Sequence, residues 1–180
     1  MLIEHQLSSF DNLITDTIPR MVQQQSPIEV NSGDNLKYKL QFLRIYINKP
    51  VQHDPDTGYQ PLYPNEARIR DLTYSAPIFV DYCQTCTTHG TVQTQIVRKV
   101  PLWKMPIMLG SKYCHLYGKS VPERAALNEC KMDRGGYFII NGSEKVVIAQ
   151  ERPVDNRIMI FKGSSEAKFV ARSEIKSTID

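Results

Sequence analysis

The 180-residue sequence has no long hydrophobic run, and no part of it approaches the roughly 20 consecutive apolar residues that a membrane-spanning helix needs. Its N-terminal stretch also lacks the cationic and apolar segments of a secretory signal peptide. These absences predict an intracellular protein with no membrane partner. In that setting its four cysteines are expected to be reduced.

Catalytic motifs are missing as well. Gly135-Gly136 is not followed by the Gly-Lys-Ser/Thr of a phosphate-binding loop, and no serine has the surroundings of a nucleophile elbow. Asp54 and Asp56 lie in a stretch rich in turn-forming residues and are not arranged as a catalytic carboxylate pair. The sequence therefore predicts no catalytic residue in this chain.

Positive charge is unevenly distributed along the chain. Residues 98–134 carry eight Lys and Arg against three Asp and Glu, whereas residues 1–97 carry seven against ten. A clustered positive excess suits a surface that faces phosphate groups. A solvated basic face of a protein would have the same composition, so both interpretations stay open.

The pattern of apolar residues predicts a strand-rich α+β fold with a helical N-terminus. Apolar side chains recur every three to four positions over residues 2–22, and Pro19 is expected to kink this helix or start a second one. Alternation of apolar and polar residues is typical of strands. Strands are expected at 36–47, 77–82, 92–99, 137–150, 157–162 and 168–175, and a further helix at 120–130.

The dipeptide Asn141-Gly142 between two apolar arms predicts a β-hairpin, because a type I′ turn needs positive φ at both central positions. Alternation along the second arm places Lys145, Val147 and Ala149 on one face. The small side chains leave room for a nucleic-acid backbone to approach Lys145. An ordinary edge hairpin explains the same pattern.

Cys83, Cys86 and His89 match half of a zinc site, and Cys114-His115 could supply the remainder. Against a metal site, the two cysteines lie in a stretch expected to be a hairpin loop, where they need have no role.

Arg68 and Arg70 alternate along a stretch that is expected to be extended. Such an arrangement places both arginines on one face. Surface arginines on an edge strand are the simplest interpretation.

Three stretches, 64–81, 104–116 and 128–152, resemble in this order the second-largest subunit of multisubunit DNA-directed RNA polymerases. The stretch 5–22 is similar to the N-terminal helix of that family. The resemblance covers nearly the whole chain and is strongest to eukaryotic nuclear enzymes and to the polymerases of large DNA viruses.

The resemblance implies that residues 1–152 form the first segment of the protrusion domain, a wall of the active-centre cleft. Residues 153–180 would begin the lobe domain and leave it incomplete, which agrees with strand alternation that stops at Asp180 without a closing turn. The chain is accordingly expected to be part of a longer nucleotidyltransferase subunit. The catalytic aspartates and Mg²⁺ would be held mainly by the largest subunit.

Carried over from the family, Lys145, Ile148 and Gln150 would lie near the path of the RNA–DNA hybrid. Arg152 would be a second cation or would brace the domain junction. The implied partners are the largest and other polymerase subunits, the DNA template, the RNA–DNA hybrid and initiation factors. The implied location is the nucleus for a cellular enzyme, and the viral factory in the host cytoplasm or the virion for a viral one.

Two other functions remain open at this stage. One is a standalone nucleic-acid-binding module, which would need a self-contained fold. The other is a zinc-stabilised interaction domain built on Cys83, Cys86 and His89. Zn²⁺ enters only with that second alternative, and otherwise no cofactor is expected in this chain.

Overall fold

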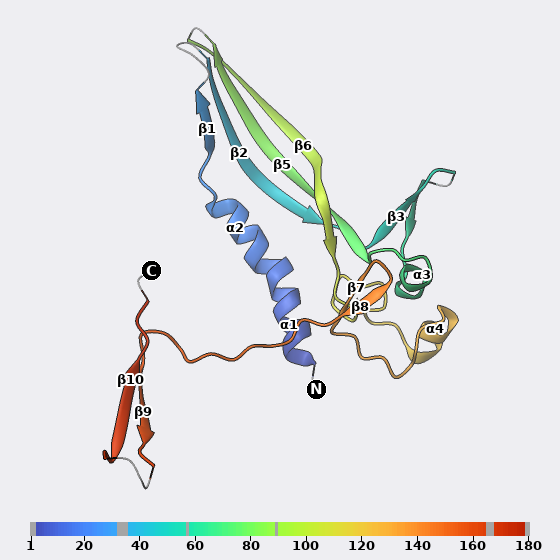
Figure 1. The fold of residues 1–180 in the computed structure, drawn as a ribbon. Helices are drawn as coiled ribbons and strands as arrows, with labels where there is room; N and C mark the ends of the chain where they lie inside the picture. Colours follow the sequence, from blue (N-terminus) through green and yellow to red (C-terminus); the bar gives the residue numbers. More distant parts are fainter. Residues whose placement is uncertain (1–2, 32–35, 57, 89, 165–167, 179–180) are drawn as a thin grey trace. The chain divides into compact units, whose positions relative to one another are not determined.

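The computed structural model describes residues 3–31, 36–56, 58–88, 90–164 and 168–178. The chain divides into two compact units, Met1–Val147 and Ile148–Asp180, and each is described by itself. Helices and several small sheets alternate along it, so the predicted strand-rich α+β class is confirmed (Figure 1).

The N-terminal helical segment consists of α1 (Glu4–Asn12), a π-helical turn (Leu13–Thr17) and α2 (Ile18–Gln24). Pro19 is the second residue of α2, so a helical segment starts at the proline, as one of the two sequence expectations had it, although Thr17 and Ile18 keep helical backbone and join it to the π-helical turn. Phe10 and Ile14 are the buried members of the apolar stripe. The ring of Phe10 packs edge-on against Phe138, which joins the segment to the core of the first unit.

The largest sheet is antiparallel, with the strand order β1-β2-β5-β6 (Figure 1). Its strands are β1 (Ile28–Asn31), β2 (Leu36–Ile47), β5 (Ser75–Thr88) and β6 (Thr91–Pro106). β5 and β6 are longer than the strands predicted at 77–82 and 92–99. The expected loop at residues 83–88 is wrong, because its threonines favour extended backbone and the pairing continues to Thr88 and Thr91.

The sheet bends where two of its strands carry an extra residue opposite Asp81 of β5. In β2 the register shifts between Phe42 and Arg44, and in β6 two residues, Arg98 and Lys99, stand opposite Asp81. Lys99 has φ 51°, which is unusual for a residue with a side chain. The Asp81 carboxylate accepts hydrogen bonds from the Lys99 amide and the Tyr46 hydroxyl, both at 2.7 Å, and so fastens both bulged strands.

We expect Asp81→Asn to make stability less dependent on pH. The Lys99 amide, and after it the Tyr46 hydroxyl, lower the pKa of the Asp81 carboxyl. A lowered folded-state pKa means that this stabilisation is present at neutral pH and is lost as pH falls through that pKa. The melting temperature of Asp81→Asn should lie below that of the wild type at about pH 7, and the gap should narrow as the pH falls below about 4, the usual pKa of a free Asp carboxyl. Asp56→Asn, at an exposed turn, is the control; a gap that stays constant with pH would contradict the role of Asp81.

The remaining elements of the first unit are short. They are β3 (Val51–Asp54), β4 (Gly58–Pro61), α3 (Pro64–Ile69), α4 (Val121–Ala126), β7 (Phe138–Ile140) and β8 (Ser143–Lys145). α4 starts at the expected place, since Ser120 and Glu123 form a capping box. The core lies among these elements and the start of β5. Its fully buried members include Ala67, Tyr74, Ala76, Ile107, Leu109, Cys114 and Ile139.

The second unit holds one antiparallel pair, β9 (Ile158–Lys162) and β10 (Ala171–Ile175). Its large apolar side chains are exposed within the described residues: Ile158, Ile160, Phe161, Phe169, Val170 and Ile175. An isolated two-stranded hairpin is at best marginally stable in water, so this pair is not expected to be stable on its own. The predicted functional division into residues 1–152 and 153–180 stays a prediction. No helix in the described part of the chain is long and apolar enough to cross a membrane.

Candidate nucleic-acid interface

The hairpin at Asn141-Gly142 is formed by β7 and β8, in which Ile140 pairs with Ser143 and Phe138 with Lys145. Asn141 has φ 48° and Gly142 has φ 74°, as a type I′ turn requires. Beyond Lys145 the chain is exposed and no longer forms a strand. The predicted second arm to residue 150 is therefore wrong, and the shared face of Lys145, Val147 and Ala149 is not formed by a strand.

The turn is fastened to the segment that precedes β5. The Gly142 amide donates to the Leu72 carbonyl at 3.0 Å, and the Asn141 amide donates to the Thr73 hydroxyl at 3.1 Å. That hydroxyl in turn donates to the Asn141 side-chain oxygen at 3.1 Å. A Cβ on Gly142 would lie 2.9 Å from the Asp71 Cα, which is backbone and cannot turn away, so the close approach requires glycine. These contacts fix the direction in which β8 leaves the turn.

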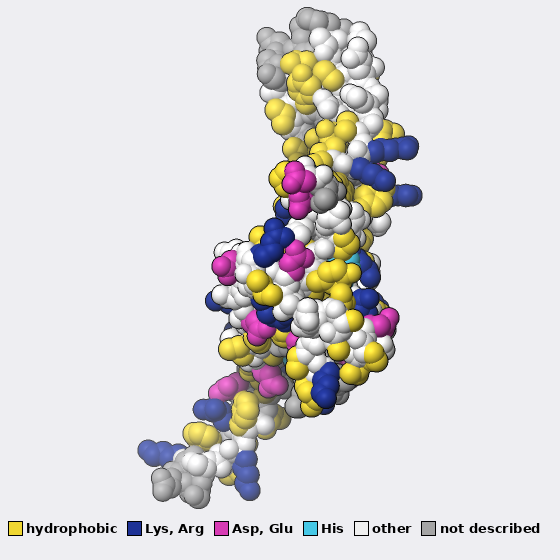
Figure 2. Space-filling model, turned by 90° about the vertical axis from the view of Figure 1, so that its right-hand side faces the viewer, with side chains coloured by type: hydrophobic (Ala, Val, Ile, Leu, Met, Phe, Trp, Pro, Cys, Tyr) yellow, Lys and Arg dark blue, Asp and Glu magenta, His cyan; other side chains and the backbone are white. Residues whose placement is uncertain are grey.

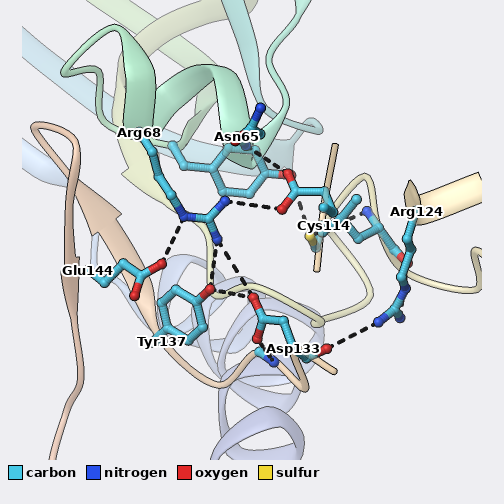
Figure 3. A network of polar contacts seen from close by, with 11 residues as sticks. Asn65, Arg68, Cys114, Arg124, Asp133, Tyr137 and Glu144 are labelled. Atoms are coloured by element: carbon cyan, nitrogen blue, oxygen red, sulfur yellow. Dashed lines mark hydrogen bonds and ion pairs between the residues drawn. The ribbon is translucent and has the colours of Figure 1, made fainter. Parts of the chain in front are cut away.

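Arg68 links α3 to β8 and to the loop after α4 (Figure 3). Its Nη1 lies 3.0 Å from Glu129 Oε2, and its Nε donates to Glu144 Oε1 at 2.8 Å. The Glu129 side chain is only 3% exposed, and its other oxygen accepts the Asn65 amide at 2.7 Å. The buried carboxylate is thereby satisfied on both oxygens, as a buried charge must be.

Tyr137 and Asp133 complete the cluster around Arg68 (Figure 3). Arg68 Nη2 donates to the Tyr137 hydroxyl at 2.7 Å and lies 3.6 Å from Asp133 Oδ2. The Tyr137 hydroxyl donates to the same Asp133 carboxylate. Burial, together with the hydrogen bond to Asp133, raises the pKa of Tyr137 above its usual range, so the hydroxyl stays protonated as a donor. We refer to Arg68, Glu129, Asp133, Tyr137 and Glu144 as the Arg68 cluster.

The extended segment predicted around Arg68 and Arg70 is wrong, because residues 64–69 form α3. The helix separates the two arginines. Arg68 is drawn into the cluster, whereas Arg70 is half exposed and pairs with Glu66 at 2.6 Å, four residues earlier. Pro64 followed by Glu66 was the available signal, since proline and acidic residues favour the first turn of a helix.

Lys145, the first predicted contact residue, is exposed at the end of β8 and forms no ion pair with any described residue. Its neighbour Glu144 is bound by Arg68. Adjacent residues of a strand point to opposite faces, so the Glu144 carboxylate is held away from the Lys145 face. Lys145 therefore presents its charge without a local acidic competitor.

Ile148, Gln150 and Arg152 belong to the second unit, and all three are exposed. Ile148 is 76% exposed, which is high for an apolar side chain of its size. Arg152 forms an ion pair with Asp155 at 3.2 Å, three residues later in the same unit, so its role as a second cation or as a brace of the domain junction stays a prediction. The shared contact surface of these residues with Lys145 stays a prediction, because the two units are described separately.

Cys83 and Cys86 lie on β5, and His89 lies outside the described residues. The pairing of β5 is regular from Cys83 to Cys86, so residues three apart point to opposite faces of the sheet. The two thiols therefore do not converge on one ion. Within the described ranges no three His, Cys, Asp or Glu are grouped so as to hold a metal. Zinc binding that involves His89 stays an untested prediction.

Comparison with known proteins places this chain in a family. A family model described as RNA polymerase beta subunit matches residues 1–170. The chain is 39% identical over 192 residues to DNA-directed RNA polymerase II subunit 2 of Arabidopsis thaliana, an alignment that covers 98% of the chain and 16% of that protein. It is 38% identical over 177 residues to DNA-directed RNA polymerase subunit Rpo2N of Methanocaldococcus jannaschii, covering 98% of the chain and 35% of that protein. The chain thus spans a minor part of the length of either relative.

The similarity extends over the helical N-terminus, the large sheet and the β7–β8 hairpin, since the family model runs through all of them. The resemblance predicted from three separate stretches is confirmed by this continuous match. The chain belongs to the RNA polymerase beta subunit family and corresponds to the N-terminal region of the second-largest subunit of DNA-directed RNA polymerase.

Proposed function

We propose that this chain forms part of the wall of the active-centre cleft in a DNA-directed RNA polymerase. In that position it helps to guide the DNA template and the RNA–DNA hybrid during transcription. Residues 1–152 are its protrusion segment and residues 153–180 the start of its lobe. The assembly is a nucleotidyltransferase, to which this chain contributes structure and charge, and no catalytic residue.

One observation carries the nucleic-acid role: an exposed cation, Lys145, stands on a hairpin whose position is fixed at both ends. The turn is held by Leu72 and Thr73, and the second arm is held by the ion pair of Glu144 with Arg68. A lysine so placed can bind a backbone phosphate with little loss of conformational freedom in the hairpin. Phosphate contacts of this kind position a nucleic acid without reading its sequence.

The proposed partners follow from the same assignment. They are the largest and other polymerase subunits, the DNA template, the RNA–DNA hybrid and initiation factors. Mg²⁺ in the whole enzyme is assigned mainly to the largest subunit. The chain would act in the nucleus if the enzyme is cellular, and in the viral factory or virion if it is viral.

Lys145→Ala in the assembled polymerase should weaken retention of the RNA–DNA hybrid. Each lost phosphate contact lowers the slope of log affinity against log salt by about one. The measurement is the dissociation of stalled elongation complexes over a range of salt concentrations.

Lys131→Ala is the matched control for Lys145→Ala, since Lys131 is an exposed lysine outside the hairpin. It should leave the salt slope unchanged. Equal slopes for the wild type and Lys145→Ala would reject the contact of Lys145 with phosphate.

A further inference from the structure

β6 is the outermost strand of the large sheet, and its outer edge has no partner strand among the described residues (Figure 1). From Thr91 to Val97 this edge carries neither charge nor proline. Two of its apolar side chains are largely exposed, Val92 at 61% and Ile96 at 55%. A long, uncharged edge of this kind readily accepts another strand.

Features that protect a sheet edge begin only after Val97. The edge is interrupted by the bulge at Arg98 and Lys99 and by Pro101, and Lys104 adds a charge to it. Each of these features commonly protects a strand edge against unwanted pairing. Among the described residues, β6 is therefore open to pairing over its first half and closed over its second. The change from open to closed lies at the bend beside Asp81.

A pocket of about 420 Å³ lies at this bend. It is lined by three cationic side chains, one carboxylate, one tyrosine and two aliphatic side chains: Arg44, Arg98, Lys99, Asp81, Tyr46, Leu43 and Ile96. The Asp81 carboxylate is already bound by the Lys99 amide and Tyr46, and Arg98 and Lys99 form no ion pair with any described residue. Figure 2 shows Lys and Arg side chains gathered on this part of the molecule, below the tip of the sheet. The pocket thus has a surplus of positive charge on a surface shared by β2, β5 and β6, and its β6 residues lie at the end of the open edge.

We propose that β6 binds an extended acidic segment of a partner protein. The segment adds a strand along Thr91–Val97, and its carboxylates enter the pocket and pair with Arg98 and Lys99. Main-chain hydrogen bonds supply the affinity of such strand addition, and the charged pocket fixes direction and register. This site is separate from the hairpin of Lys145, and the inference does not depend on the role proposed there.

The chemistry of the edge favours a peptide over a nucleic acid. A strand edge offers N–H donors and C=O acceptors in alternation, and a peptide backbone satisfies both. A phosphate backbone carries acceptors but no donors, so it would leave the carbonyl groups of β6 unpaired. The exposed Val92 and Ile96 likewise match alternate apolar side chains of an added strand.

The assembled polymerase can be tested with a fluorescent peptide of alternating valine and threonine that ends in glutamates. A second peptide ends in lysines instead. Anisotropy should show preferential binding of the glutamate peptide, and Arg98→Glu should weaken it about tenfold and improve binding of the lysine peptide. Arg98→Ala, which adds no negative charge beside Asp81, should weaken binding about threefold.

Lys131→Glu, an equal charge reversal on an exposed lysine elsewhere, should change neither affinity. Hydrogen exchange at residues 91–97 should slow when the glutamate peptide binds. Three results would overturn the proposal. Hydrogen exchange at residues 91–97 could stay unchanged when the peptide is added, or these residues could be protected without peptide by self-association of the polymerase. The third result is a single-stranded RNA that binds in an Arg98-dependent way while the peptide does not bind.

Discussion

Replacing Arg68 with alanine should lower the free energy of unfolding by about 3–5 kcal/mol, the usual cost of removing one partner of a buried ion pair. The Glu129 carboxylate, whose side chain is 3% exposed, would keep the Asn65 amide but lose its counter-charge. Tyr137 and Glu144 would lose a donor as well. Denaturant unfolding of the variant and the wild type measures the difference.

Arg70→Ala is the matched control, because Arg70 is half exposed and its ion pair with Glu66 lies on the surface. Its cost should stay below about 1 kcal/mol. A second change, Glu129→Gln, should recover part of the loss in the Arg68→Ala background, since it removes the stranded charge. Equal costs for Arg68→Ala and Arg70→Ala would show that the cluster adds nothing beyond a surface pair.

Arg68→Ala should also affect the candidate nucleic-acid interface. Without Arg68, the Glu144 carboxylate loses its counter-charge, so its negative charge beside Lys145 is no longer offset and would repel an approaching phosphate. We therefore expect Arg68→Ala to weaken hybrid retention in the assembled polymerase even where the protein remains folded. Glu144→Gln in that background should restore retention, because the competing charge is removed.

Gly135→Ala should lower the free energy of unfolding by about 3 kcal/mol or more, nearly as much as Arg68→Ala, since it combines backbone strain with a steric clash. A Cβ at this position would lie 2.2 Å from the Leu109 carbonyl oxygen, which is buried backbone and cannot move aside cheaply. Gly135 also has φ 76°, a region that L-residues enter at a cost. The neighbouring hydrogen bonds of Leu109 with Gly136 and Tyr137 would be displaced. Chemical denaturation of the variant gives the value.

Gly118→Ala separates the two causes. Gly118 has φ 74°, almost the same backbone conformation, but nothing lies within 4 Å of an added Cβ. Only the conformational cost of about 1–2 kcal/mol should remain there. If the two alanine variants lose the same stability, the close approach of Leu109 is relieved by movement of the chain and the steric argument fails.

Local chemistry alone determined several features of this protein. The Asn141-Gly142 turn, the Ser120–Glu123 capping box and the helical stripe of residues 2–22 all follow from rules that act within a few positions. Membership of the polymerase family could be predicted from three stretches that occur in the family's order, because the order of motifs along a sequence can be compared without knowing the fold.

Tertiary contacts decided the parts that sequence reasoning missed or misjudged. Pro64 and Glu66 favour the helix at residues 64–69 locally, but the place of Arg68 in a buried cluster was decided by partners far along the chain, among them Glu144, 76 positions away. The bend of the large sheet depends on Asp81, which fastens β2 and β6 at once. Gly135 is required because the Leu109 backbone passes directly beside it. Alternation and turn rules describe a backbone in isolation, whereas the burial of a charge or the approach of two strands is set only when distant segments pack together.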